Sequence, residues 1–241
     1  MQEWFDELKR QFILNFINDN RWQFLLNGLM VTLRITFFAL VMGIVIGVVV
    51  AIIRSTCDKN QSGARGAGWF ILRFFNVMCK LYLTVIRGTP VVVQLMIFYF
   101  VILVSVKNGE LIGIIAFGIN SGAYIAEIFR SGIMSIDNGQ FEAGRSLGFN
   151  YIQTMRYIVI PQAFKNILPT LANEFIVLLK ETAVAGYVAV QDLTKAGDII
   201  RGRTFSAFMP LIAVALVYLA LVMFFTWLVG ILEKRLRNSE R

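Results

Sequence analysis

The sequence contains no histidine. This absence excludes nucleophilic triads built on histidine, zinc sites with histidine ligands and histidine proton relays. Cysteine is scarce as well, and the spacing of Cys57 and Cys79 indicates neither a disulfide framework nor a metal knuckle. Charged side chains make up only 16% of the 241 residues, against about 25% in a typical soluble domain. The sequence therefore argues against a soluble enzyme of these kinds.

Apolar residues are abundant instead, at 57% of the chain, and the mean hydropathy is +0.68. A membrane-spanning helix needs about 20 mostly apolar residues. Five stretches meet this length: 28–53, 81–106, 111–129, 167–190 and 208–232. We therefore expect an all-α integral membrane protein with five transmembrane helices. Residues 1–27 then form an N-terminal amphipathic segment, 28–232 the transmembrane domain and 233–241 a basic cytoplasmic tail.

The net charge of +8 is a topological signal in such a protein rather than a sign of nucleic-acid binding. With the N-terminus outside, the inside segments 54–89, 130–165 and 233–241 hold 14 of the 23 Lys and Arg residues. The outside segments 1–27, 107–110 and 191–207 hold seven. Because basic residues concentrate in cytoplasmic loops, the count predicts an outside N-terminus and a cytoplasmic C-terminus.

The first 27 residues lack the apolar core and the cleavage site of a secretory signal. Trp4, Leu8, Phe12 and Phe16 recur every four residues, which predicts one apolar helix face. This face suits a helix that lies on the membrane surface, and packing against the helix bundle explains it equally well.

Small residues recur at the same spacing inside two expected spans. Such stripes let helix backbones approach closely in a bilayer, so we expect them to be packing surfaces. The residues are Ala39, Gly43, Gly47 and Ala51 in the first span and Gly118, Gly122 and Ala126 in the third.

The most informative segment is the predicted inside loop 139–161, GQFEAGRSLGFNYIQTMRYIVIP. Gly148 interrupts its amphipathic pattern, and glycine readily ends a helix. Asn150 then stands where it can cap a second short helix, which is expected to stop at Pro161. Glu142 is expected near the N-terminus of the first helix, where the helix dipole favours a carboxylate. A pair of short cytosolic helices with apolar and aromatic side chains suits insertion into a groove of a partner protein.

The same loop resembles the EAA signature of ABC importer permeases, EAA-x3-G-x9-I-x-L-P. Gly144 replaces the second alanine, which is expected to loosen the first short helix, and Ile160 replaces the leucine. Three further segments are similar to those of the polar amino acid permeases, and together the resemblance covers about residues 25–235. These segments are RGTP-x3-QL at 87–95, AYIAEIFR at 123–130 and the stretch from NEFI to Lys180 at 173–180.

The resemblance implies the MetI-like type I fold of an ABC importer permease, in which the EAA loop forms coupling helices that dock into separate ATPase subunits. It assigns this coupling to Glu142, Ala143, Gly144, Gly148 and Pro161. It also implies a bacterial plasma (inner) membrane, a second permease chain that is identical or a paralogue, and an extracytoplasmic solute-binding protein. The sequence has no G-x4-G-K-[ST] phosphate loop, so ATP and Mg²⁺ are expected on the partner ATPase and no cofactor in this chain.

Ionisable side chains at bilayer depth cost at least about 2.5–3.5 kcal/mol each, so each needs a reason. Glu127 lies one helical turn from Arg130, with Arg87 as a further candidate partner, which predicts a structural ion pair or a gating contact. Arg34 lies six residues into the first expected span and can extend to the outer interface.

The expected fourth span is the richest in polar groups. Its residues Glu174 and Glu181 share one helix face, and Asn173 and Lys180 share the next. Groups of both signs suit the ammonium and carboxylate of an amino acid, but an interhelical salt-bridge network explains them too, and both interpretations stay open. The substrate-pathway candidates are Gln94, Tyr124, Asn173, Glu174, Lys180, Glu181 and Thr182. Single polar residues in spans more often form hydrogen bonds between helices, which makes Gln94, Tyr124, Asn120 and Ser121 secondary candidates.

The leading hypothesis is the permease subunit of an ATP-driven importer that carries polar amino acids by alternating access, with no catalytic or metal-binding residue. The alternative is a self-sufficient ion-coupled amino acid carrier or channel that uses Glu127, Glu174 and Glu181. Repeated halves, which many such carriers contain, are not visible in the sequence. A membrane enzyme is disfavoured because no nucleophile–base pair or metal-ligand cluster is present. The sequence determines neither the amino acid nor whether the two permease chains are identical.

Overall fold

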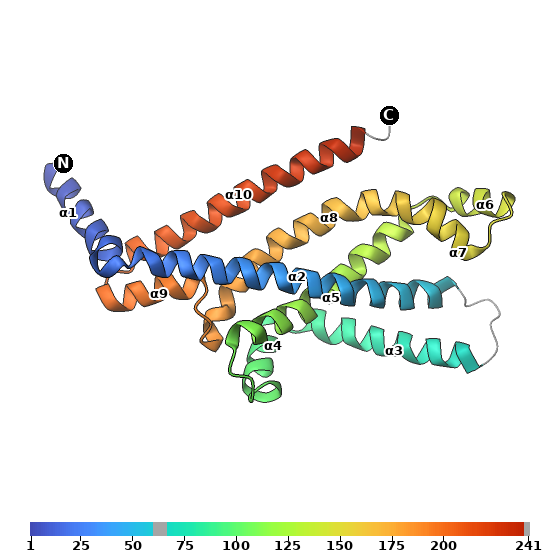
Figure 1. The fold of residues 1–241 in the computed structure, drawn as a ribbon, viewed down its shortest axis with the longest axis horizontal. Coiled ribbons are helices and arrows are strands. Elements are labelled where there is room, and N and C mark those ends of the chain that lie inside the picture. The colour runs from blue at the N-terminus through green and yellow to red at the C-terminus, as the bar shows by residue number, and fades with distance from the viewer. Residues whose placement is uncertain (60–66, 239–241) are drawn as a thin grey trace. The chain divides into compact units, whose positions relative to one another are not determined.

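The computed structural model describes residues 1–59 and 67–238, which fold into helices joined by short turns (Figure 1). No strand occurs in these two ranges, in agreement with the expected all-α class. Residues 239–241 of the expected basic tail lie outside the described residues. The α-helices are α1 (Gln2–Phe12), α2 (Trp22–Lys59), α3 (Ala67–Gly88), α4 (Val91–Ile97), α5 (Gly109–Met134), α6 (Asn138–Ser146), α7 (Tyr151–Thr154), α8 (Ile160–Glu181), α9 (Leu193–Thr204) and α10 (Phe208–Asn238).

Four of the described helices are long and apolar enough to cross a membrane, namely α2, α3, α5 and α10. The first, third and fifth expected spans fall on α2, α5 and α10. The fourth expected span begins in α8, which is as long as α3 at 22 residues. It does not count among the four, since Lys165, Glu174, Lys180 and Glu181 make it more polar.

The expected second span, 81–106, is wrong. Helix α3 ends at Gly88, and only the short α4 and the π-helical turn Phe98–Ile102 follow. The break has a local cause, because Pro90 disfavours a helical conformation at the residue before it and has no N–H to donate. The spanning helix instead begins at Ala67 and includes Arg73 and Lys80. With Arg87, these leave eleven inside basic residues against seven outside, which weakens the orientation signal without reversing it.

The chain forms two compact units, each built from several segments. The first contains Met1–Ala39, Val91–Phe117 and Ile176–Trp227. In this unit α2 and α9 are in close contact, because a Cβ atom on Gly28 would be 2.7 Å from the backbone oxygen of Asp192. The buried Asp192 caps α9 by accepting hydrogen bonds from the N–H groups of Thr194 and Lys195.

The N-terminal segment is attached to the first unit near its end rather than along α1. Helix α1 has no buried residue, and Trp4 and Phe12 are exposed, whereas Phe16 is buried. Asn15 is fully buried and accepts a hydrogen bond of 2.7 Å from Thr204. Most of the apolar stripe therefore lies on the surface of the described chain, and only its last member, Phe16, is buried.

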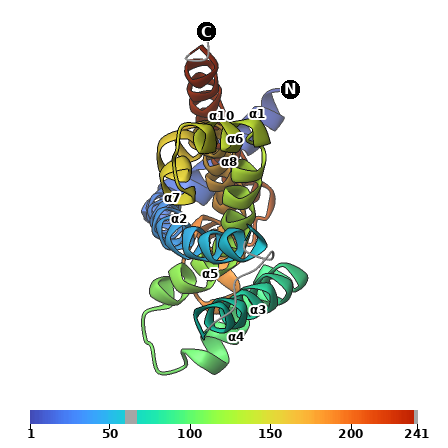
Figure 2. The same cartoon turned by 90° about the vertical axis from the view of Figure 1, so that its right-hand side faces the viewer.

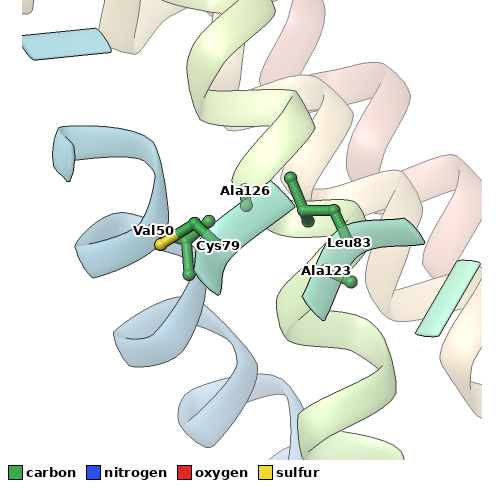
Figure 3. Packing of buried hydrophobic residues seen from close by; sticks show 5 residues of the cluster. All are labelled: Val50, Cys79, Leu83, Ala123 and Ala126. Atoms are coloured by element: carbon green, nitrogen blue, oxygen red, sulfur yellow. The ribbon is translucent and has the colours of Figure 1, made fainter. Parts of the chain in front are cut away.

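The second unit contains Leu40–Pro90, Gly118–Phe175 and Leu228–Arg241. Its small residues do form a packing surface, because a Cβ atom on Gly47 of α2 would be 2.6 Å from Ile125 of α5. Gly122 likewise lies where a Cβ atom would be 3.0 Å from Ile46. One core cluster joins α2, α3 and α5 through Val50, Cys79, Leu83, Ala123 and Ala126 (Figure 3).

Candidate functional site

The first short helix of loop 139–161 is present as α6, and an aspartate caps it. The side chain of Asp137 accepts a 2.7 Å hydrogen bond from the N–H of Gly139. Glu142 is exposed and is the fifth of the nine residues of α6. The expectation that Glu142 lies near the helix N-terminus is therefore wrong, since Asp137 occupies that position. Its carboxylate projects from the middle of the helix and is accessible to a partner.

Gly148 and Asn150 separate the two short helices as the sequence predicts. Gly148 has a φ of +78°, a conformation that other residues adopt only with strain. Asn150 and Gln153 then form a capping box, in which each side chain accepts a 2.9 Å hydrogen bond from the backbone N–H of the other residue. The bend between α6 and α7 is thus fixed by backbone conformation and by two reciprocal bonds.

Gly144 allows α6 and α7 to pack directly against each other. The two helices lie side by side (Figure 1 and Figure 2). Gly144 is buried, and a Cβ atom there would be 2.6 Å from Cγ2 of Thr154. The expectation that this glycine loosens the first short helix is wrong, because the glycine is what lets Thr154 approach.

Helical structure continues past the expected stop at Pro161. A π-helical turn, Met155–Val159, leads from α7 into α8, and Pro161 is the second residue of α8. Proline is tolerated in the first turn of a helix, and a π turn rearranges the hydrogen bonds before it. The second short helix therefore runs through the π-helical turn directly into α8.

The loop exposes large apolar side chains. Leu147 is 70% exposed, Ile152 74% and Tyr157 61%. Partial burial raises the pKa of the neighbouring Tyr151 phenol above its ordinary value. Such an apolar set on a short, firmly capped helix pair is suited to a protein groove.

Three arginines surround the carboxylate of Glu127, and these four side chains form one charged group. Arg54 lies 2.8 Å from it, Arg130 3.2 Å and Arg87 3.8 Å. The side chains of Arg54 and Glu127 are only 16% and 24% exposed. The contacts predicted from Arg130 and Arg87 are present, and Arg54 of α2 is an additional partner. One carboxylate thus connects α2, α3 and α5, and the group carries a net charge of +2.

Tyr124 lies one helical turn from Glu127 and contacts the same group. The guanidinium carbon of Arg87 is 5.7 Å from the centre of the Tyr124 ring, which is a cation–π distance. Arg87 is 45% exposed on the side-chain level, so its remaining hydrogen-bond donors stay accessible. Arg87 is therefore the member of the group that is best placed to meet a solute.

Polar candidates in α8 have different surroundings. Glu174 accepts a 3.1 Å hydrogen bond from the hydroxyl of Ser121 on α5. Asn173 donates to the backbone oxygen of Pro169 within its own helix. Glu174 therefore links α8 to α5 by this hydrogen bond, and Asn173 is bonded within its own helix.

The remaining candidates belong to the first unit. Gln94 and Thr182 are buried, and Thr182 donates to the backbone oxygen of Leu179. Lys180 is exposed and Glu181 is partly buried. Arg34, expected to extend to the interface, pairs with Glu110 at 2.9 Å.

Sequence reasoning missed Asp137, Arg54 and Thr154. The cap at Asp137 was detectable, because an aspartate directly before a helical pattern is a standard start signal. Arg54 and Thr154 meet their partners through tertiary packing, 73 and ten residues away in sequence, and no local pattern marks such contacts.

The chain is similar to a family of known proteins over most of its length. A family model described as "Binding-protein-dependent transport system inner membrane component" matches residues 64–238. The arginine transport system permease protein ArtQ of Bacillus subtilis is 34% identical over 220 residues, which cover 90% of this chain and 94% of ArtQ. The glutamine transport system permease protein GlnP of Escherichia coli is 33% identical over 217 residues, which cover 88% of this chain and 93% of GlnP.

Solved structures agree with these relatives. A crystal structure of an amino acid ABC transporter with histidines has a TM-score of 0.80 and 37% identity, and the match covers 91% of this chain and 98% of the other. An inward-facing structure of the MetNI methionine ABC transporter has a TM-score of 0.74 at 20% identity, covering 89% and 96%. The second likeness concerns the fold alone.

Proposed function

The chain belongs to the family of binding-protein-dependent transport system inner membrane components, and we propose that it is the permease of an ATP-driven importer for a polar amino acid. The relatives named for arginine and glutamine transport support the substrate class. One structural observation supports the mechanism: α6 and α7 form a firmly capped, exposed helix pair that a partner protein can bind. Because the sequence has no phosphate-binding loop, this partner is the ATPase.

Five helices cross the membrane in this proposal, with α8 added to the four apolar ones. The polar side chains of α8 then face protein or water rather than lipid. The N-terminus lies outside and the C-terminus in the cytoplasm, which the eleven-to-seven distribution of basic residues supports. This orientation puts α6 and α7 in the cytoplasm of a bacterium, beneath its plasma membrane.

The coupling segment receives the power stroke of a separate ATPase subunit. Glu142, Ala143, Gly144, Gly148 and Pro161 form this segment, and the exposed apolar side chains of the loop enter a groove of the ATPase. ATP and Mg²⁺ bind to that subunit, and this chain holds no cofactor. Because the helical path runs from α7 into α8, motion of the docked segment is transmitted to the α8 polar residues.

Two further groups have roles in the transport path. Gln94, Tyr124, Asn173, Glu174, Lys180, Glu181 and Thr182 line or border the substrate path. Arg87, Glu127 and Arg130 form a gating or structural group, and the distances of 3.8 Å from Arg87 and 3.2 Å from Arg130 to the Glu127 carboxylate support their acting together.

The chain works with three partners. Five spans enclose little polar space, so a second permease chain, identical or paralogous, completes the path. An ATPase subunit supplies energy, and an extracytoplasmic solute-binding protein delivers the amino acid. The self-sufficient ion-coupled carrier is not favoured, because the relatives are components of binding-protein-dependent systems.

Reconstitution tests this function. The complex of permease, ATPase and binding protein in proteoliposomes should accumulate a radiolabelled polar amino acid only when ATP is on the ATPase side. Uptake that continues without ATP, driven by an ion gradient, would support the carrier alternative and contradict the proposal. The matched control is the same complex with an ATPase variant that binds but does not hydrolyse ATP.

A further inference from the structure

Helix α3 presents three different faces. Its buried face packs within the second unit through residues such as Cys79 and Leu83, which are 8% and 5% exposed. A second face is apolar and exposed, with Phe74, Leu81 and Val85 at 60%, 56% and 49%. This face is suited to lipid.

Between these two faces runs a line of basic residues. Arg73, Lys80 and Arg87 are spaced by seven residues, so they lie above one another along one side of the helix. All three are exposed. Thr84 lies beside the same line and bonds to the backbone oxygen of Lys80. We call Arg73, Lys80 and Arg87 the basic line of α3.

Lys80 is too deep in the membrane to be explained by lipid contact. It is the fourteenth of the 22 residues of α3, so about 20 Å of helix precedes it and about 12 Å follows it. A charged side chain at this depth costs at least about 2.5–3.5 kcal/mol against lipid, and such residues generally face a water-filled cavity or the bundle interior. Among the described residues its ammonium has no ion pair.

The line is not neutralised by acidic residues of its own helix. Helix α3 contains three basic residues and no Asp or Glu. Arg73 lies over the ring of Trp69 at 5.0 Å, and Arg87 is the most distant of the three arginines around Glu127. In the second unit, Glu127 is already shared with Arg54 and Arg130. An excess of positive charge therefore remains along the exposed side of α3.

We infer that the basic line of α3 lines the aqueous substrate path and selects an amino acid that carries a second carboxylate. This rests on the proposed function and names its substrate class: an acidic amino acid of net charge −1. Arg87 receives one carboxylate, and the unpaired Lys80 receives the other as the solute passes. A positive wall attracts such a solute and repels a cationic one.

Transport by the complete complex tests the substrate class. Uptake of L-glutamate, L-glutamine and L-arginine is compared for the wild type and for Lys80→Gln, with Lys107→Gln in an exposed loop as the matched loss of one charge. We expect Lys80→Gln to lower glutamate uptake about tenfold relative to glutamine, and Lys107→Gln to leave the ratio unchanged. A wild type that prefers arginine, or a ratio that Lys80→Gln leaves unaltered, overturns the inference. A complex that imports no amino acid contradicts the proposed function instead.

Thiol labelling tests the aqueous lining independently of transport. In a chain with Cys57 and Cys79 replaced by alanine, Lys80→Cys and Leu81→Cys place thiols on neighbouring faces of α3. A charged, water-soluble thiosulfonate should modify Lys80→Cys at least tenfold faster than Leu81→Cys, and L-glutamate should slow the first reaction. Equal rates at the two positions would mean that the basic line faces lipid or protein, and the inference would fail.

Discussion

Gly144 of α6 lies against Thr154 of α7 without room for a single carbon atom between them. A Cβ atom on Gly144 would be 2.6 Å from Cγ2 and 2.7 Å from Oγ1 of Thr154. Real Cβ atoms do not tolerate such distances, so alanine at 144 would force the two helices apart. The glycine that departs from the EAA signature is thus paired with the threonine ten residues later.

Gly144→Ala should destabilise the packed helix pair by about 1–3 kcal/mol, because overpacking displaces α7. Hydrogen exchange of the α7 amides should become faster, and transport-coupled ATP hydrolysis should fall. Adding Thr154→Ala removes both nearest atoms and should restore slow exchange. Gly230→Ala in α10, where nothing lies within 4 Å, is the control and should have no effect. Failure of the double variant to recover would show that the contact is not the cause.

Gly148→Ala should cost about 1–2 kcal/mol locally, because a φ of +78° is strained for any residue with a Cβ atom. Gly148→Asn should cost less, since asparagine visits the left-handed region more readily. Circular dichroism should show the bundle unchanged, while limited proteolysis at the loop should rise in the order glycine, asparagine, alanine. Equal proteolysis of all three proteins would contradict the requirement for this conformation.

Glu127→Gln should lower the free energy of unfolding of the detergent-solubilised protein by about 1–3 kcal/mol. The reason is that three guanidinium groups lose their shared carboxylate in a mostly buried site. Glu110→Gln removes the partner of a single arginine that is 53% exposed and should cost less than about 1 kcal/mol. Thermal unfolding of both variants in one detergent makes the comparison. A larger loss for Glu110→Gln would contradict the central role of Glu127.

Local sequence signals were reliable where the structure depends on local chemistry. The interruption at Gly148 and the cap at Asn150 follow from backbone freedom and from a side chain that bonds nearby, and both are present. The family resemblance also identified the right class of protein. The second span was predicted wrongly for two reasons. The apolar residues on both sides of Pro90 suggested one continuous helix, and the charges of Arg73 and Lys80 argued against a span over the residues of α3.

Tertiary contacts explain the rest of the difference. Nothing in the sequence near Glu127 indicates that Arg54, 73 residues away, is its nearest partner. Similarly, no local pattern marks the contact between Gly144 of α6 and Thr154 of α7, which explains why a glycine stands at this position. Pairings of this kind depend on how helices cross, which a one-dimensional pattern does not contain.

Glu142→Lys should uncouple ATP hydrolysis from transport while leaving the bundle folded. The side chain is exposed in the middle of α6, so the charge reversal acts on a partner rather than on the fold. Uptake should fall at least tenfold, while thermal unfolding stays within the experimental error of the wild type. Arg145→Gln changes another exposed charge on the same helix and serves as the comparison. Normal uptake by Glu142→Lys would refute its assignment to coupling.

The most direct test asks what the exposed tip of this helix pair touches in the assembled transporter. Ile152→Cys, in a chain with both native cysteines replaced, puts a thiol at a side chain that is 74% exposed. In membrane vesicles, a short thiol-reactive cross-linker should join residue 152 to the ATPase subunit, and a membrane-impermeant reagent should reach it from the cytoplasmic side alone. Labelling of residue 152 from outside, with no cross-link to the ATPase, would contradict the account.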